Sequence, residues 1–205
     1  MGDFETADYV MTNTGFQENN LSLKTGLNRI DHGFEIYYSL FSNQLGILRS
    51  SHAHTAIDII NAINNEIPSV IEEFSYDINI PRQKISHNLV KIKAFKNFNF
   101  GKLSMRYDYQ VNDRKEFDIR REDYRKKPAL DLNLQTHSVA LDVESKFDGS
   151  SNFKAGVSGR YQKNFPDPAT GVKRIIPDYK KYDFSFYSIY DTTFNGDWLV
   201  EAGVR

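Results

Sequence analysis

The sequence predicts an all-β protein built from long antiparallel strands. Three observations lead to this fold class. Apolar and polar residues alternate with a period of two along most of the 205 residues. Aromatic residues, which favour strands, make up 14% of the chain. Short and long links between the alternating segments follow one another in strict alternation.

The alternating segments form pairs joined by tight turns. A less regular segment near residues 3–11 precedes them and predicts an uncertain first strand. The four pairs that follow are 19–30 with 33–41, 87–98 with 103–113, 137–147 with 153–161, and 182–194 with 198–205. We therefore expect about nine antiparallel strands.

The links between the pairs are long. They span about 40 residues from Asn43 to Gln83, about 20 near 113–131 and about 17 near 164–180. Compact soluble domains rarely contain several loops of this size. Outer-membrane barrels have tight turns at one rim and long loops at the other. The pattern therefore favours such a barrel.

The first long link is predicted to contain one short helix. Ala56, Ile60, Ile63 and Ile67 recur at helical spacing, and Pro68 ends the pattern. Thr55 is suited to cap the first turn, with Asp58 three residues later completing a capping box. The apolar stripe needs a packing partner, which we expect among neighbouring loop residues.

The two faces of each strand differ in chemistry. In "LSMRYDYQVND", residues 103–113, Leu103, Met105 and Tyr107 lie on one face, while Arg106 and Asp108 lie on the other. The alternation lasts for about ten residues, long enough for a tilted strand to cross a bilayer. Lys or Arg facing lipid at the midplane costs about 2–4 kcal/mol. We therefore expect the charged faces to line a hydrated lumen; the predicted lumen-facing residues are Lys91, Lys93, Arg106, Asp108, Lys154 and Arg160.

These features together predict an antiparallel transmembrane β-barrel fragment that forms a single domain over residues 1–205. Aromatic residues such as Tyr107, Tyr161 and Trp198 are candidates for the interfacial girdles. The last alternating segment runs to the end of the sequence, which suggests part of a larger barrel. Open strand edges are not tolerated in lipid, so the fragment is expected to need the rest of the barrel.

Composition excludes several other classes. Lys and Arg (26) balance Asp and Glu (27), which gives no electrostatic reason to expect nucleic acid as a partner. Cysteine is absent, so thiol catalysis and Cys-ligated zinc are excluded. No motif fixes a nucleophile beside a base, and no nucleotide-binding glycine pattern is present. We expect neither an enzyme nor a cofactor.

Two long links contain candidate ligand-binding residues. The stretch "RSSHAHT" supplies Arg49, His52 and His54; a pair of histidines without a nearby carboxylate is a weak metal site, and we predict no bound metal. The stretch "RKEFDIRREDYRKK" is rich in guanidinium groups, which suit carboxylate or phosphate ligands. Its candidates are Arg114, Arg120, Arg121, Tyr124 and Arg125.

Several phrases resemble a known family. They are "NTGFQENNLSL", "YYSLFSNQLGILRSSH", "PRQKISHNLVKIKA", "RKEFDIRR", "PALDLNLQTHSVALD" and "WLVEAGVR". They resemble the barrel of TonB-dependent outer-membrane receptors, particularly the large group typical of Bacteroidetes. The resemblance implies a 22-stranded barrel with a plug domain and a TonB box, both absent from this sequence.

The resemblance also implies a function. Such receptors import a bulky, scarce nutrient, such as a ferric siderophore, a corrinoid or an oligosaccharide, across the cell outer membrane. Energy would arrive through a TonB-type complex that contacts the missing plug, so the expected partners are that complex, the ligand and outer-membrane lipid. Two other functions stay open: a passive porin-like channel, and a soluble β-sandwich that binds a ligand such as carbohydrate.

Overall fold

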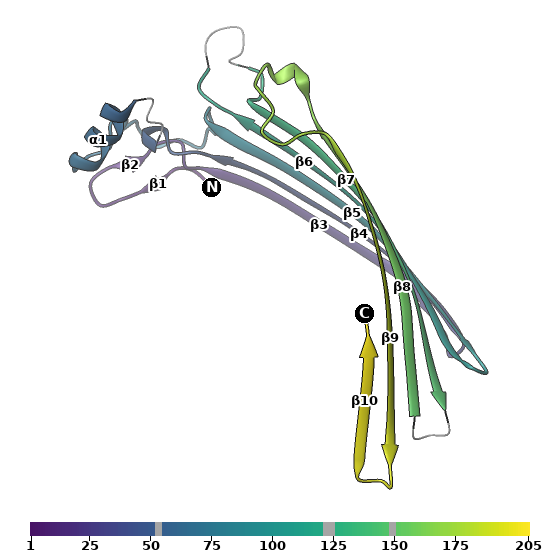
Figure 1. Cartoon of the computed structure of the whole chain (residues 1–205). Coiled ribbons are helices and arrows are strands. Elements are labelled where there is room, and N and C mark those ends of the chain that lie inside the picture. The colour runs from purple at the N-terminus through teal and green to yellow at the C-terminus, as the bar shows by residue number, and fades with distance from the viewer. Residues whose placement is uncertain (52–54, 121–125, 148–150) are drawn as a thin grey trace.

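The chain forms one curved antiparallel sheet of eight strands, with a small hairpin and a short helix at one end (Figure 1). The computed structural model describes residues 1–51, 55–120, 126–147 and 151–205. Neighbouring strands in the sheet are also consecutive in sequence, so the sheet is a meander. Its strands are β3 (Phe16–Asn28), β4 (His32–Gly46), β5 (Arg82–Phe98), β6 (Gly101–Phe117), β7 (Leu130–Phe147), β8 (Ser151–Pro166), β9 (Tyr179–Phe194) and β10 (Trp198–Val204).

All four predicted strand pairs are confirmed as hairpins. Seven of the eight strands are longer than the alternating segments: β7, for example, has 18 residues, whereas β10, with 7, is one residue shorter than predicted. The additional residues lie mainly toward the long links, where polar residues interrupt the alternation but backbone pairing continues. Backbone hydrogen bonds do not require an amphipathic pattern, so the alternation of residues underestimates the length of the strands at these ends.

The prediction of a strand over residues 3–11 was wrong. This segment forms β1 (Phe4–Glu5) and β2 (Val10–Met11), a separate two-stranded sheet. Eight strands, rather than about nine, therefore build the main sheet.

The predicted order of short and long links is confirmed. All long links emerge at the same end of the sheet as β1 and β2, and the tight turns lie at the other end (Figure 1). We call these the loop end and the turn end.

The predicted helix is confirmed as α1 (Ala56–Asn64). Thr55 Oγ1 accepts a hydrogen bond from the backbone N–H of Asp58, and the Asp58 carboxylate accepts one from the N–H of Thr55. The expected packing of its apolar stripe was wrong, because Ile60 and Ile63 are 56% and 77% exposed. No helix in the described residues has the length and apolar character needed to span a bilayer.

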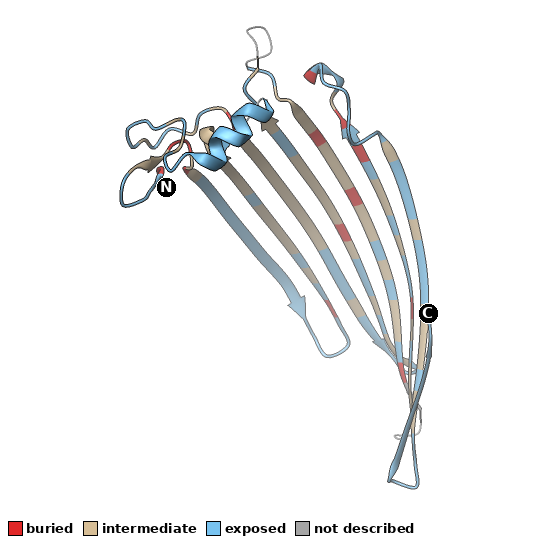
Figure 2. Cartoon of the chain, turned by 60° about the vertical axis from the view of Figure 1, so that its left-hand side comes forward, coloured by how far each residue is buried: buried red, intermediate tan, exposed pale blue. Residues whose placement is uncertain are grey.

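The sheet has almost no core. Leu132 is the one large hydrophobic residue that is buried in the described part of the chain, and most residues along the strands are half-buried or exposed (Figure 2). The accessible surface is 14571 Å². A compact protein of this mass, 23.7 kDa, exposes about 9,800 Å². A single layer with both faces open accounts for the excess.

The hairpins are staggered along the sheet. The row that starts at His32, the first residue of β4, passes through Lys96, Leu103, Val143 and Ala155 and reaches β9 at Ser188. β9 continues to Phe194, six residues farther toward the turn end (188 to 194). Each successive turn therefore lies farther along the strand direction.

The sheet is open. β3 and β10 are its edges, and they are not paired with each other. The chain does not close into a barrel by itself.

Candidate functional site

The charged residues predicted to face a lumen lie on one face of the sheet. Lys91 pairs with Asp108 and Lys93 with Arg106 across β5 and β6. Asp108 lies opposite Ser138, which lies opposite Arg160 on β8. Directly opposed residues point to the same side, and Lys154 is an even number of residues from Arg160. These residues define the charged face; that it lines a water-filled interior stays a prediction.

Three carboxylates on the charged face are each shared by two cations. We call these groups the charge triads: Lys24–Glu35–Lys93, Lys91–Asp108–Arg106 and Arg160–Asp183–Lys181. Each triad holds two positive charges and one negative charge. The face therefore carries a net positive charge at each triad although the whole chain is nearly neutral.

The triads differ in geometry and in exposure. Asp108 Oδ2 lies 3.1 Å from Arg106 Nε, and Oδ1 lies 3.9 Å from Lys91 Nζ. The Asp108 side chain is 11% exposed. Asp183 Oδ2 accepts a 2.8 Å hydrogen bond from Arg160 Nε, and its side chain is 36% exposed. Of these two triads, the one around Asp108 has the less exposed carboxylate.

A hollow of about 750 Å³ lies near the turn end, with most of its lining from the charged face. Lys24, Glu35, Lys93 and Arg106 from two of the triads contribute to it, and so does Asp142 on β7. Asp142 Oδ1 also accepts a 2.7 Å hydrogen bond from the Tyr187 hydroxyl. The hollow is lined by ammonium and guanidinium groups beside carboxylates that already accept other hydrogen bonds or ion pairs. This lining suits a polar or anionic solute.

Toward the loop end, the same face changes character. The row one step nearer the loop end carries Ser22, Ser39, Leu89, Gln110, Thr136 and Gln162, and it ends on β9 at the triad residue Lys181. Gln162 Nε2 donates a 3.0 Å hydrogen bond to Thr136 Oγ1. From β3 to β8 the polar side chains of this row are uncharged donors and acceptors, and Lys181 is its one charged residue.

The opposite face carries an apolar belt. Directly opposed residues again share this side, so the register identifies its members. They include Leu27, Phe34, Ile36, Ile92, Leu103, Met105, Val139, Leu141, Val157, Phe184 and Phe186. Phe184 is 85% exposed and Val157 50%. Nothing in the described residues covers this belt.

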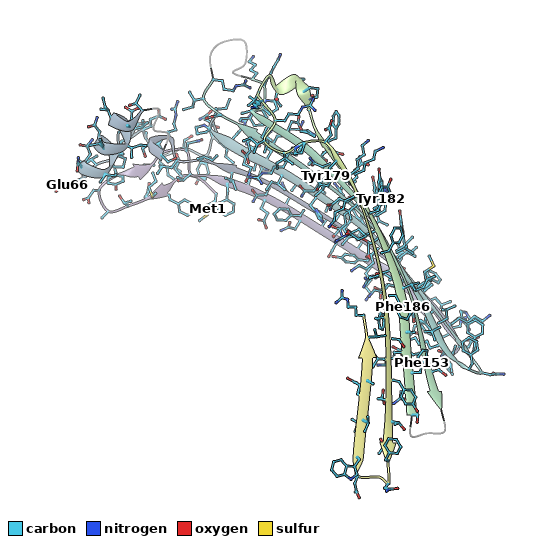
Figure 3. The ribbon with its side chains drawn as sticks, viewed as in Figure 1. Met1, Glu66, Phe153, Tyr179, Tyr182 and Phe186 are labelled. Atoms are coloured by element: carbon cyan, nitrogen blue, oxygen red, sulfur yellow. The ribbon has the colours of Figure 1, made fainter. Side chains whose placement is uncertain are left out.

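Aromatic residues border the belt on both sides. The row toward the loop end contains Tyr38, Tyr109, His137, Tyr161 and Tyr182, which we call the upper aromatic row. The rings of Tyr109 and His137 are 4.6 Å apart, and those of Tyr161 and Tyr182 are 5.0 Å apart. Toward the turn end lie Phe153, Tyr190, Phe194 and Trp198. Tyr182, Phe186 and Phe153 follow one another down the sheet in Figure 3.

Two of the predicted girdle residues border the belt and one does not. Tyr161 belongs to the upper aromatic row, and Trp198 lies at the turn end. Tyr107 lies one row inside the belt, opposite Val139, and its hydroxyl is 2.8 Å from His137 Nδ1. It therefore extends the aromatic cluster into the belt.

The loop candidates that the structure describes bind their neighbours. Arg49, in the short 3-10 helix η1 (Arg49–Ser51), forms an ion pair with Glu72 at 2.5 Å. Arg114 is paired with Glu116 on β6. Arg120 Nη1 donates a 2.9 Å hydrogen bond to the carbonyl of Thr170, which joins two long links. The remaining candidates, His52, His54, Arg121, Tyr124 and Arg125, lie outside the described residues.

Two ionisable groups beyond the belt have shifted pKa values. The hydrogen bond from Lys115 to Asp131, 2.7 Å long, raises the pKa of that ammonium group and links β6 to β7. At the first turn, the hydrogen bond with His32 lowers the pKa of the Asp31 carboxyl. The Asp31 contribution to stability is therefore present above its ordinary pKa and lost as the pH falls. Within the described residues, no cluster of three or more His, Asp or Glu side chains is arranged to hold a metal.

Sequence reasoning missed two of the three groups in each of two triads. Glu35 and Lys24 lie on β4 and β3, and Asp183 and Lys181 lie on β9. Each lies on the polar side of an alternating segment, and that was the available signal. Their partners follow only from the register between strands. The register of β3 and β4 could have been counted outward from the turn at 29–31, since Asn28 pairs with Gly33.

No family model matches the chain, and no curated protein matches its sequence.

Proposed function

We propose that this chain is a segment of an outer-membrane β-barrel that takes up a bulky nutrient with energy supplied through TonB. The observation that carries the proposal is the apolar belt with its aromatic borders. Bilayer-spanning barrels present an outward apolar band about 25 Å tall between girdles of aromatic residues, with a polar interior. The belt, the two borders and the charged face have this arrangement.

The stagger of the hairpins supports the proposal independently. From β4 to β9 there are five spacings between strands, about 24 Å sideways, while the turns shift by six residues, about 20 Å. If all turns lie at one level, the strands tilt by about 40° from the normal to that level. Closed barrels have strand tilts of about 35–45°.

The small size of the second sheet argues against a soluble β-sandwich. A sandwich buries its apolar face against a second sheet about 10 Å away. The other sheet among the described residues has only two residues in each strand. Burying the belt in a sandwich would therefore require another sheet of similar size from outside this chain.

A passive porin-like channel is the second candidate, because it would have the same belt and charged face. The two functions differ in the interior. A receptor carries a plug domain in the same polypeptide, whereas a porin narrows its channel with an inward loop. A plug-coding sequence upstream in the gene would support the receptor, and its absence from the complete gene would support the porin.

Single cysteines placed in the complete protein test the membrane assignment. This chain has no cysteine, so a label at each position from 138 to 143 reports on one face at a time. In proteoliposomes, spin labels at 139, 141 and 143 should collide with oxygen, which is concentrated in lipid. Labels at 138, 140 and 142 should collide with a water-soluble nickel complex. The reverse pattern, or uniform exclusion of both probes at odd positions, would refute the membrane barrel.

Uptake is tested separately by deleting the complete gene in its host. Growth should become impaired when iron, cobalamin or a complex glycan is limiting, and the complete gene should restore it. Unchanged growth under all three limitations would reject nutrient uptake while leaving the membrane assignment intact.

A further inference from the structure

Two lysines on the belt side of the sheet lie directly beyond the upper aromatic row. Lys163 on β8 and Lys180 on β9 are cross-strand partners. They are two residues from Tyr161 and Tyr182 respectively, which are also directly opposed. Both lysines therefore project from the same face as the belt, one step nearer the loop end.

This pair of like charges has no counter-charge in the described structure. Directly opposed like charges destabilise a sheet. The same row continues with Gln135 and Val111, which are uncharged. Neither ammonium group has an ion-pair partner within the described residues. A bound anion would remove the repulsion.

The neighbouring carboxylates are already engaged. The nearest along the chain is Asp178, two residues before Lys180, and it forms an ion pair with Arg174 at 3.2 Å. Asp131 on β7 binds Lys115 at 2.7 Å. Both carboxylates therefore have cationic partners other than the lysine pair.

One position of the belt below the lysines has no side chain. In the row beyond Tyr161 and Tyr182, Gly159 lies between Val139 and Phe184. A Cβ added at Gly159 would have its nearest neighbours at 3.6 Å, in ordinary contact distance. The missing side chain therefore leaves space of about one methyl group between Val139 and the exposed ring of Phe184.

We propose that Lys163 and Lys180 bind the phosphate group of an anionic outer-leaflet lipid, whose acyl chain lies over Gly159. The inference rests on the proposed function, because the upper aromatic row must lie at the level of the lipid headgroups. The opposed Cβ atoms are about 4.5–5.5 Å apart, close enough for both ammonium groups to reach one phosphate. The phosphate, the tyrosine pair and the gap at Gly159 then follow one line down the membrane surface.

The test uses the complete protein in detergent, with diphosphoryl lipid A as the probe. Bound lipid is counted by native mass spectrometry during a titration. The double variant Lys163→Gln/Lys180→Gln should weaken lipid A binding about tenfold to a hundredfold, since each contact joins two charged groups. Lys163→Arg/Lys180→Arg should retain most of the binding.

The matched control is Lys154→Gln/Lys181→Gln, which removes two lysines from the same strands but from the charged face. Lipid A binding should stay unchanged in this variant. Equal binding by the wild type and both glutamine variants would overturn the proposal. Inorganic phosphate that displaces lipid A completely at millimolar concentration would also overturn it, because the site would then take a free anion.

Failure of the proposed function would give a different result. Before titration, each variant is checked for the mobility shift that folded outer-membrane barrels show on unheated denaturing gels. A wild type without this shift would reject both proposals. A normal shift in all variants, combined with equal lipid A binding, would reject the lipid site alone.

Discussion

At the scale of single residues, the same substitution at two adjacent positions of one strand should change stability by very different amounts. Val139→Lys puts an ammonium group on the apolar belt, whereas Ala140→Lys puts it on the charged face. In the complete barrel in lipid, we expect Val139→Lys to lower the free energy of unfolding by about 2–4 kcal/mol. Ala140→Lys lies opposite Arg106 in a hydrated position and should lower it by no more than about 1 kcal/mol. Urea titrations in bilayers measure both, and a larger loss for Ala140→Lys would contradict the assignment of faces.

The carboxylate of Asp108 should matter more than the carboxylate of Asp183. Each is shared by two cations, but Asp108 is the less exposed. Asp108→Asn removes a carboxylate that is 11% exposed and leaves Lys91 and Arg106, which are 32% and 53% exposed, without their shared counter-charge. We expect a loss of about 1–2 kcal/mol for Asp108→Asn. Asp183→Asn should cost no more than about 1 kcal/mol. The comparison is made from urea midpoints at low and high salt, and equal losses would refute the role of burial.

At the scale of elements, Asn13 ties the N-terminal segment to the first long link. It is 3% exposed, and its Nδ2 donates hydrogen bonds to the carbonyls of Ile47 at 2.9 Å and Pro81 at 2.7 Å. Its Oδ1 accepts a 2.8 Å hydrogen bond from the N–H of Asn79. These bonds fix both ends of the link where it leaves β4 and enters β5.

Removing the Asn13 side chain should release this link locally. Asn13→Ala abolishes three hydrogen bonds of a buried side chain, and we expect amide hydrogen exchange at 47–51 and 79–80 to speed up by at least about thirtyfold. The control is Asn195→Ala in the last turn. Asn13 and Asn195 both have positive φ, 63° and 52°, so both variants carry the same backbone strain. Equal acceleration at 47–51 in the two variants would show that the hydrogen bonds do not fix the link.

The elements also show how much of the structure could be predicted from the sequence. The alternation in 103–113 gave the correct faces and the correct hairpin partner, because a half-buried strand requires that pattern. Lys163 and Lys180 each lie in polar surroundings in the sequence, and only the register between β8 and β9 makes them neighbours. The packing of α1 was mispredicted for another reason. An apolar stripe shows that a helix has an amphipathic surface, but not that the chain supplies a partner for it.

At the scale of the whole molecule, the single tryptophan tests the proposed membrane insertion. Trp198 is 72% exposed and lies at the turn-end border of the belt. On insertion of the barrel into liposomes, its fluorescence should shift to shorter wavelength. Lipids brominated near the headgroup should quench it more strongly than lipids brominated near the chain ends, because indole rings prefer the interface. In a complete protein with further tryptophans, the difference from Trp198→Phe isolates this signal. Stronger quenching by chain-end bromines would contradict its position at the border.

The stagger of the hairpins has a consequence for the size of the proposed barrel. A drift of six residues over five steps is about 1.2 residues for each strand, so a ring of 22 such strands would meet its own beginning about 26 residues out of step. With a tilt of about 40°, that ring would be about 44 Å across between opposite backbones. A bore of this width admits whole metabolites and small folded domains alike. Selectivity would then have to come from an obstruction held inside the ring.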